Sequence, residues 1–196
     1  MIENPFSYNK YLVCKQFMKL FGATLRFYAP SNQSLALFVS MKAFKLKEDI
    51  RVYTDEQKLH EVLAIKARSI IDISSVYDVW DPAKNEKVGA LKRRGFKSMI
   101  KDEWVIMDQY DREIGLITED SLLLALLRRF VTRLIPQKFH GEIGDRHVFT
   151  LEQHFNPIIT KMDVDFTPDI MQTLDRRLGI AATVLMCCIE GRQGGY

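Results

Sequence analysis

Residues 168–189 read PDIMQTLDRRLGIAATVLMCCI, and this stretch decides what kind of fold the chain can adopt. Its first half mixes apolar and polar residues in the manner of an amphipathic helix. The twelve residues from Leu178 onward are apolar on every side, with Thr183 as the one polar residue among them. Twelve residues are too few to cross a bilayer, which takes roughly 20. The pattern therefore predicts a helix that begins at the mouth of a protein core and ends inside it.

The flanking residues predict where this helix begins and ends. Thr167 suits the N-cap, Pro168 suits the first helical position, and Asp169 complements the helix dipole. Gly191 suits the end of the helix. We therefore expect a central helix over residues 168–190.

The core around this helix is predicted to consist of hairpins, because the preceding sequence repeats. A lysine begins each of four copies, at positions 15, 42, 66 and 92, with spacings of 27, 24 and 26 residues. Each copy holds strand-like segments around a turn rich in Asp, Asn, Ser or Pro, which are turn-forming residues. The predicted turns are Ala29–Asn32, Thr54–Gln57, Asp81–Asn85 and Asp108–Asp111. Hairpins of this kind must pair edge to edge, and closure into a barrel removes their exposed edges.

After the fourth copy, Ser121–Ile135 predicts a helix with a leucine-rich face and an arginine-bearing face, ended by Pro136. Further strands are expected at Lys138–Ile143, His147–Leu151, Ile158–Thr160 and Met162–Phe166. The predicted fold is mainly β (α+β): a closed β-barrel of roughly twelve strands, built of repeated hairpins and threaded by the buried C-terminal helix. We expect one domain over residues 1–196, with a helix insertion at 121–135.

Composition and charge narrow the range of partners. The chain is 47% hydrophobic and 27% charged, as in an ordinary globular protein, and its formal charge of +3 argues against a nucleic-acid partner. The charge is clustered, since Lys84–Lys101 holds seven basic residues and one acidic residue, Glu86. This segment is a candidate anion-facing surface.

The cysteines and the N-terminal residues predict the cellular compartment of the protein. Cys14, Cys187 and Cys188 are an odd number, and the last two lie in the apolar helix, where they suit small buried side chains. Met1–Lys10 lacks the charged leader and apolar run of a secretory signal. We expect a reduced, cytoplasmic protein that contacts membranes peripherally.

Motifs of catalysis are not found in the sequence. The histidines at 60, 140, 147 and 154 lack metal-ligand spacing and are expected to be isolated structural residues. No phosphate-binding glycine loop, nucleophile elbow or paired cysteine and histidine is present. We expect no catalytic residue, no metal and no cofactor, although folding could still assemble an enzyme site from distant residues.

Four segments resemble a known superfamily. They are Tyr77–Asp81, Val88–Leu91, Asp163–Phe166 and Leu174–Ala181. Together they resemble the tubby C-terminal-like superfamily, and within it the LURP-one-related proteins and phospholipid scramblases. The resemblance implies a twelve-stranded barrel threaded by its last helix, with phosphoinositide binding through basic side chains on the outside.

The sequence departs from the scramblase pattern ahead of the final helix. Scramblase-like proteins carry an acidic calcium-binding segment there, whereas in this chain Phe166, Pro168 and Asp169 match it and Ile158–Lys161 replaces its acidic pair. The resemblance therefore does not extend to calcium binding or lipid scrambling.

The leading functional hypothesis is a non-enzymatic intracellular module that binds anionic phospholipid or phosphoinositide headgroups on the outer barrel surface. The candidate residues are Lys92, Arg93, Arg94 and Lys97, aided by Arg128, Arg129 and Arg133. The alternative is a protein-interaction scaffold that uses the leucine-rich amphipathic helix at 121–135. The predicted partner is therefore an anionic membrane surface or, in the alternative, another protein.

Overall fold

The computed structural model describes residues 4–18, 22–30, 34–41, 49–69, 75–94, 103–119, 137–154 and 160–189. Within these ranges the chain forms twelve β-strands and one α-helix, α2 (Arg176–Ile189). The strands are β1 (Lys10–Met18), β2 (Gly22–Tyr28), β3 (Leu35–Met41), β4 (Asp49–Tyr53), β5 (Glu61–Ala67), β6 (Val76–Asp81), β7 (Glu86–Arg93), β8 (Glu103–Met107), β9 (Glu113–Glu119), β10 (Lys138–Ile143), β11 (Arg146–His154) and β12 (Thr160–Asp165).

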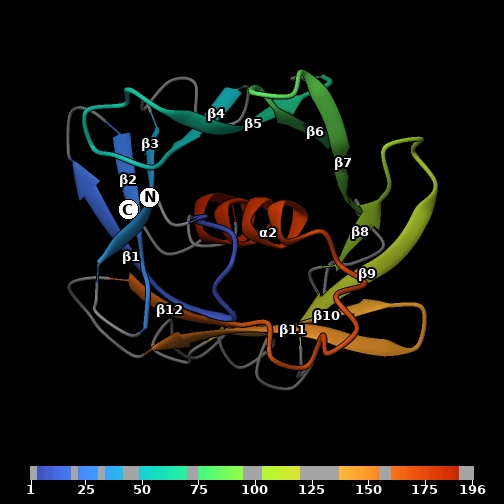
Figure 1. The fold of residues 1–196 in the computed structure, drawn as a ribbon. Coiled ribbons are helices and arrows are strands. Elements are labelled where there is room, and N and C mark those ends of the chain that lie inside the picture. The colour runs from blue at the N-terminus through green and yellow to red at the C-terminus, as the bar shows by residue number, and fades with distance from the viewer. Residues whose placement is uncertain are drawn as a thin grey trace, which may run out of the picture.

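The strands form a closed antiparallel barrel in which each strand pairs with its neighbours in sequence (Figure 1). The last strand closes the ring on the first, with Lys10 opposite Asp165 and Lys15 opposite Thr160. Closure leaves the described strands without a free edge, so no row of unpaired backbone groups invites aggregation. The predicted closed barrel of repeated hairpins is confirmed.

The predicted turns at Thr54–Gln57, Asp81–Asn85 and Asp108–Asp111 fall at connections between paired strands, whereas Ser31 and Asn32 of the predicted Ala29–Asn32 turn lie outside the described residues. Asn85, Asp111 and Gly144 have φ values of 51°, 65° and 57°, each inside a hairpin turn. Asn and Asp tolerate this left-handed region better than most residues, and Gly adopts it freely. The strands β10 and β11 on either side of Gly144 match the strands predicted at Lys138–Ile143 and His147–Leu151.

Side chains alternate between the two faces of the barrel wall. Leu91 of β7 and Trp104 and Ile106 of β8 belong to the main core, whereas Ala90 and Val105 belong to a separate small cluster on the other face. The period-2 alternation of strands produces this division. Both faces of this part of the wall are therefore apolar.

Helix α2 lies in the main core with the inward side chains. In Figure 1 it is drawn within the outline of the strands. Leu178 and every residue from Ile180 to Cys188 are buried. Cys187 contacts Met162 of β12, and the side chain of Lys15 on β1 donates to the Cys187 carbonyl oxygen. The apolar half of the quoted stretch is thus buried, as its composition predicts.

The predicted start of this helix is wrong, because α2 begins at Arg176 and not at Pro168. The Asp169 carboxylate accepts hydrogen bonds from the Thr173 and Leu174 backbone N–H groups, and Gln172 has a φ of 51°. These bonds hold residues 168–174 in turns instead of a helix. Asp175 then takes the N-cap role that was assigned to Thr167, since its carboxylate accepts the Arg177 N–H at 2.9 Å.

Two other predictions are corrected or lie outside the described residues. Thr160–Asp165 is one continuous strand, because it pairs along its length with β1 and β11. The prediction of two separate strands, Ile158–Thr160 and Met162–Phe166, is therefore wrong, and Ile158 and Ile159 lie outside the described residues. The helix predicted at Ser121–Ile135 lies outside the described residues.

The antiparallel order gives the barrel two distinct ends. The connections after β2, β4, β6, β8, β10 and β12 share one end, called here the hairpin end. The connections after β1, β3, β5, β7, β9 and β11 share the other, called the opposite end. Helix α2 begins at the hairpin end, where the guanidinium of Arg177 reaches Asp81 and Glu86 beside the β6–β7 turn.

Candidate functional site

The two ends of the barrel differ in the charge of their connections. By sequence, the connections at the opposite end hold eleven Lys or Arg and four Asp or Glu, whereas those at the hairpin end hold three and seven. Nine of the eleven basic residues and all four acidic residues at the opposite end lie outside the described ranges. Part of this charge is paired within the molecule, since Asp111 of the β8–β9 turn forms ion pairs with Lys87 on β7 at 2.6 Å and with Arg68 from the connection after β5. Fixed charge of one sign at one end attracts partners of the other sign.

The strands that precede the predicted anion-binding segments both run toward the opposite end. β7 ends at Arg93, and β9, which precedes residues 120–136, ends at Glu119. One strand, β8, separates them, with Arg93 opposite Trp104 and Glu103 opposite Thr118. The chain segments that carry Lys97 and the arginines at 128, 129 and 133 therefore leave the barrel from nearby points, although these four residues lie outside the described ranges.

Ion pairs offset part of the charge of the described candidates. Lys92 lies 3.8 Å from a Glu113 oxygen, and Arg94 pairs with Glu103 and, at 3.6 Å, with Glu113. All these side chains are partly exposed, and such pairs contribute little to stability in water. The basic groups thus remain accessible to an anionic surface.

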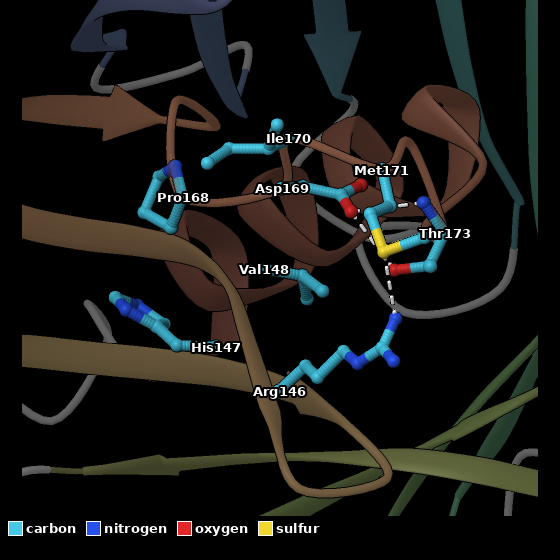
Figure 2. Close-up of a pocket in the computed structure, with 8 residues that line it drawn as sticks. All are labelled: Arg146, His147, Val148, Pro168, Asp169, Ile170, Met171 and Thr173. Atoms are coloured by element: carbon cyan, nitrogen blue, oxygen red, sulfur yellow. Dashed lines mark hydrogen bonds between the residues drawn. The ribbon is translucent and has the colours of Figure 1, made fainter.

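A hollow of about 300 Å³ lies at the hairpin end, between the β10–β11 turn and the segment that leads to α2 (Figure 2). Arg146, His147 and Val148 line one side. Pro168, Asp169, Ile170, Met171 and Thr173 line the other. The sequence does not reveal this site, because the two sides lie twenty or more residues apart in the chain.

The segment on the second side is held by the carboxylate of Asp169, which is buried. Its Oδ1 accepts the Thr173 N–H and O–H, each at 2.8 Å, and its Oδ2 accepts the Leu174 N–H at 3.0 Å. These three bonds fill three of the roughly four acceptor positions of the carboxylate and hold it in place. Asp169 is therefore a structural residue of the hollow and not a free ligand for a cation.

The start of α2 is fastened by a charged cluster centred on Arg177. Its guanidinium donates to Asp175, Asp81 and Glu86 at 2.7–2.8 Å. Partial burial opposes ionisation of Asp81, but the Lys84 N–H and the Arg177 guanidinium together hold the pKa of Asp81 below its usual value. Arg176 turns away from this cluster and lies over the Phe166 ring at 4.3 Å. Burial lowers the pKa of Arg176.

The prediction that the four histidines are isolated is wrong, because His60 lies 3.3 Å from Asp55, His154 lies 2.7 Å from Asp163, and the other two contact each other. His140 Nδ1 and His147 Nε2 lie 3.2 Å apart, on the paired strands β10 and β11. His147 Nε2 also lies 2.9 Å from the Phe149 carbonyl oxygen, which can only accept, so that nitrogen carries the proton. The pair is a cross-strand contact that only the register of β10 and β11 creates.

The lysine that begins the first repeat copy, Lys15, lies deep in the core, which the repeat pattern does not predict. Lys15, which is 3% exposed, donates to the Cys187 carbonyl oxygen near the end of α2. The lysines at equivalent repeat positions, Lys66 and Lys92, are not buried. Burial raises the pKa of the neighbouring Cys187 thiol to about 11, so this thiol is protonated and unreactive at neutral pH.

The described residues hold neither a cluster of metal-ligating side chains nor a membrane-spanning helix. In that part of the chain, no three His, Cys, Asp or Glu side chains come together as ligands for a metal ion. No helix among the same residues is long and apolar enough to cross a membrane.

The fold defines a closed antiparallel β-barrel with a buried C-terminal helix. Comparison of the chain with protein-family models, with curated proteins and with solved structures finds no match in any of the three.

Proposed function

We propose that this protein is a non-enzymatic intracellular binding module that engages anionic phospholipid or phosphoinositide headgroups with the opposite end of its barrel. The observation that carries the proposal is the excess of basic residues in the connections at that end, eleven against four acidic. Near an anionic membrane each basic residue contributes on the order of 1 kcal/mol, so a cluster of this size suffices for peripheral binding.

The proposal also concerns helix α2, which we infer to thread the barrel and fill its interior. In support, α2 starts beside Asp81 at the hairpin end, and its last turn contacts Lys15 and Met162 on β1 and β12. A filled interior holds no large ligand, in contrast to barrels of similar size that enclose one. Binding is therefore assigned to the outside of the barrel. The resemblance to tubby-like and scramblase-like proteins fits this assignment and stays a prediction.

Sedimentation with vesicles tests the lipid proposal. At low salt we expect binding to vesicles that contain phosphatidylserine and little binding to pure phosphatidylcholine. The variant Lys92→Gln/Arg93→Gln/Arg94→Gln should bind the anionic vesicles at least tenfold more weakly, because it removes three positive charges from the opposite end. Added salt should weaken the binding of the unmodified protein as well.

A matched control removes three positive charges from the hairpin end instead, in Lys58→Gln/Lys84→Gln/Arg112→Gln. This variant should bind anionic vesicles as the unmodified protein does. If the protein shows no preference for anionic over neutral vesicles at low salt, the lipid proposal fails; if both triple variants lose binding equally, the assignment to the opposite end fails.

A further inference from the structure

Two large apolar side chains stand in solvent at the hairpin end, next to the hollow of Figure 2. Ile170 is 89% exposed and Met171 is 69% exposed. The three hydrogen bonds to Asp169 and the positive φ of Gln172 hold the segment in this conformation. The exposure is thus a fixed feature of the fold, and exposed apolar groups beside a hollow are typical of a binding site.

Arg146 lies on the other side of the hollow without a carboxylate partner among the described residues. Its guanidinium contacts the thioether sulfur of Met171 at 2.9 Å, and thioethers are weak acceptors. Arg112, in another turn at the hairpin end, pairs instead with Asp108 at 2.6 Å. The hollow therefore combines an uncompensated cation with an apolar wall made by Ile170, Met171 and Val148.

The volume of the hollow and the charges around it limit which ligands it can bind. A volume of about 300 Å³ equals that of roughly ten water molecules, which leaves room for a ligand of about ten non-hydrogen atoms. A guanidinium matches a carboxylate through two parallel hydrogen bonds. The connections at the hairpin end carry more acidic than basic residues, including Asp145 beside Arg146, and this excess disfavours a dianionic phosphate or an anionic membrane.

We propose that the hollow binds a small monocarboxylate with a short apolar chain. The carboxylate accepts hydrogen bonds from Arg146 and displaces the thioether contact, while the chain packs against Ile170 and Met171. A ligand cation is disfavoured because the Asp169 oxygens are already occupied by three donors. This site is separate from the basic connections at the opposite end, so the proposal does not depend on lipid binding.

Titration with sodium octanoate, below the concentration at which it forms micelles, tests the proposal. The readout is the NMR signal of the methionine methyl groups, with that of Met171 assigned from a Met171→Leu variant. We expect saturable shifts of the Met171 signal at low millimolar octanoate. Octylammonium, which has the same chain and the opposite charge, should produce no saturable shift, and neither should inorganic phosphate.

Matched variants assign the effect to residues. Arg146→Gln should weaken octanoate binding about tenfold or more, because it removes the charge-assisted hydrogen bonds. Ile170→Ser should weaken it about fourfold or more through lost apolar contact. Arg112→Gln and Leu59→Ser, which change an exposed arginine and an exposed leucine in other hairpin-end turns, should leave binding unchanged.

The outcomes that overturn the proposal are equally specific. They are the absence of a saturable shift, equal binding of octylammonium, and unchanged affinity in folded Arg146→Gln protein. Substitution of Lys92, Arg93 and Arg94 by Gln should not alter octanoate binding. Failure of this site and failure of the lipid site are therefore distinguishable.

Discussion

Gly179 lies near the start of α2, although glycine has a low helix propensity. Packing requires it there, because a larger side chain would not fit. A Cβ added there would collide with Cε1 of the Phe166 ring, lie 2.8 Å from its Cζ, and lie 3.2 Å from a Leu174 methyl carbon. The ring itself is held between Arg176 and the rings of Tyr11 and Phe149. The ring is therefore confined and has little freedom to move aside.

At this residue scale we predict that Gly179→Ala destabilises the protein by about 1–3 kcal/mol, because overpacking of a filled core outweighs the gain in helix propensity of about 1 kcal/mol. Urea denaturation measures the change in the free energy of unfolding. The double variant Gly179→Ala/Phe166→Leu should lose less than the sum of the two single variants, since the smaller side chain relieves the collision. A stabilised Gly179→Ala protein would contradict this packing.

At the scale of elements, the N-terminus of α2 is positioned by the cluster around Arg177. The Arg177 side chain, which is 18% exposed, joins Asp175, the N-cap of α2, to Asp81 and Glu86 beside the β6–β7 turn. An ion-pair network of this kind, partly shielded from water, contributes more than an exposed pair. This network holds the N-terminus of α2 next to the β6–β7 turn.

We predict that Arg177→Gln destabilises the protein at neutral pH by about 1–3 kcal/mol, and that this loss shrinks in acid. The folded protein holds the pKa of Asp81 below its unfolded value of about 3.9. The associated stability is present above the unfolded pKa and is lost as the pH falls through the folded one. Without Arg177 that pKa returns toward its usual value, so the two proteins should converge in stability between about pH 5 and pH 2.

Denaturation at a series of pH values measures this convergence. Arg112→Gln is the control. Arg112 pairs with Asp108, but its side chain is 73% exposed, so loss of this ion pair should have little effect on stability at any pH. A difference between Arg177→Gln and the unmodified protein that stays constant from pH 6 to pH 2 would show that the cluster does not act through its carboxylates.

At the scale of the whole molecule, the barrel and α2 share one core. The main cluster of buried residues contains inward side chains of the strands together with α2 residues such as Ile180, Val184 and Leu185. A closed ring of twelve strands without this helix would leave its inward apolar side chains without partners. We therefore expect barrel and helix to fold in one cooperative transition.

We predict that Leu185→Lys abolishes folding, because Leu185 is fully buried and an unpaired ammonium ion in that position costs several kcal/mol. Circular dichroism during heating measures the transition. Leu59→Lys is the matched control, since Leu59 is 75% exposed and should tolerate the charge. A soluble Leu185→Lys protein with a cooperative transition would contradict the inference that α2 threads the barrel.

The sequence by itself determined the features that depend on nearby residues. Alternation along strands, turn residues such as Asn85 and Gly144, and the apolar run after Leu178 all act over a few positions, so the hairpins, the closed barrel and the buried part of the helix could be predicted.

The tertiary structure alone decided the features that depend on residues far apart in the chain. The start of α2 shifted to Arg176 because Asp169 forms a local turn and Arg177 finds partners on β6 and β7. Arg146 beside Met171 depends on the placement of β11 against the segment before α2. Local sequence patterns do not predict such contacts, because the energy of a long-range contact depends on which surfaces the closed fold brings together.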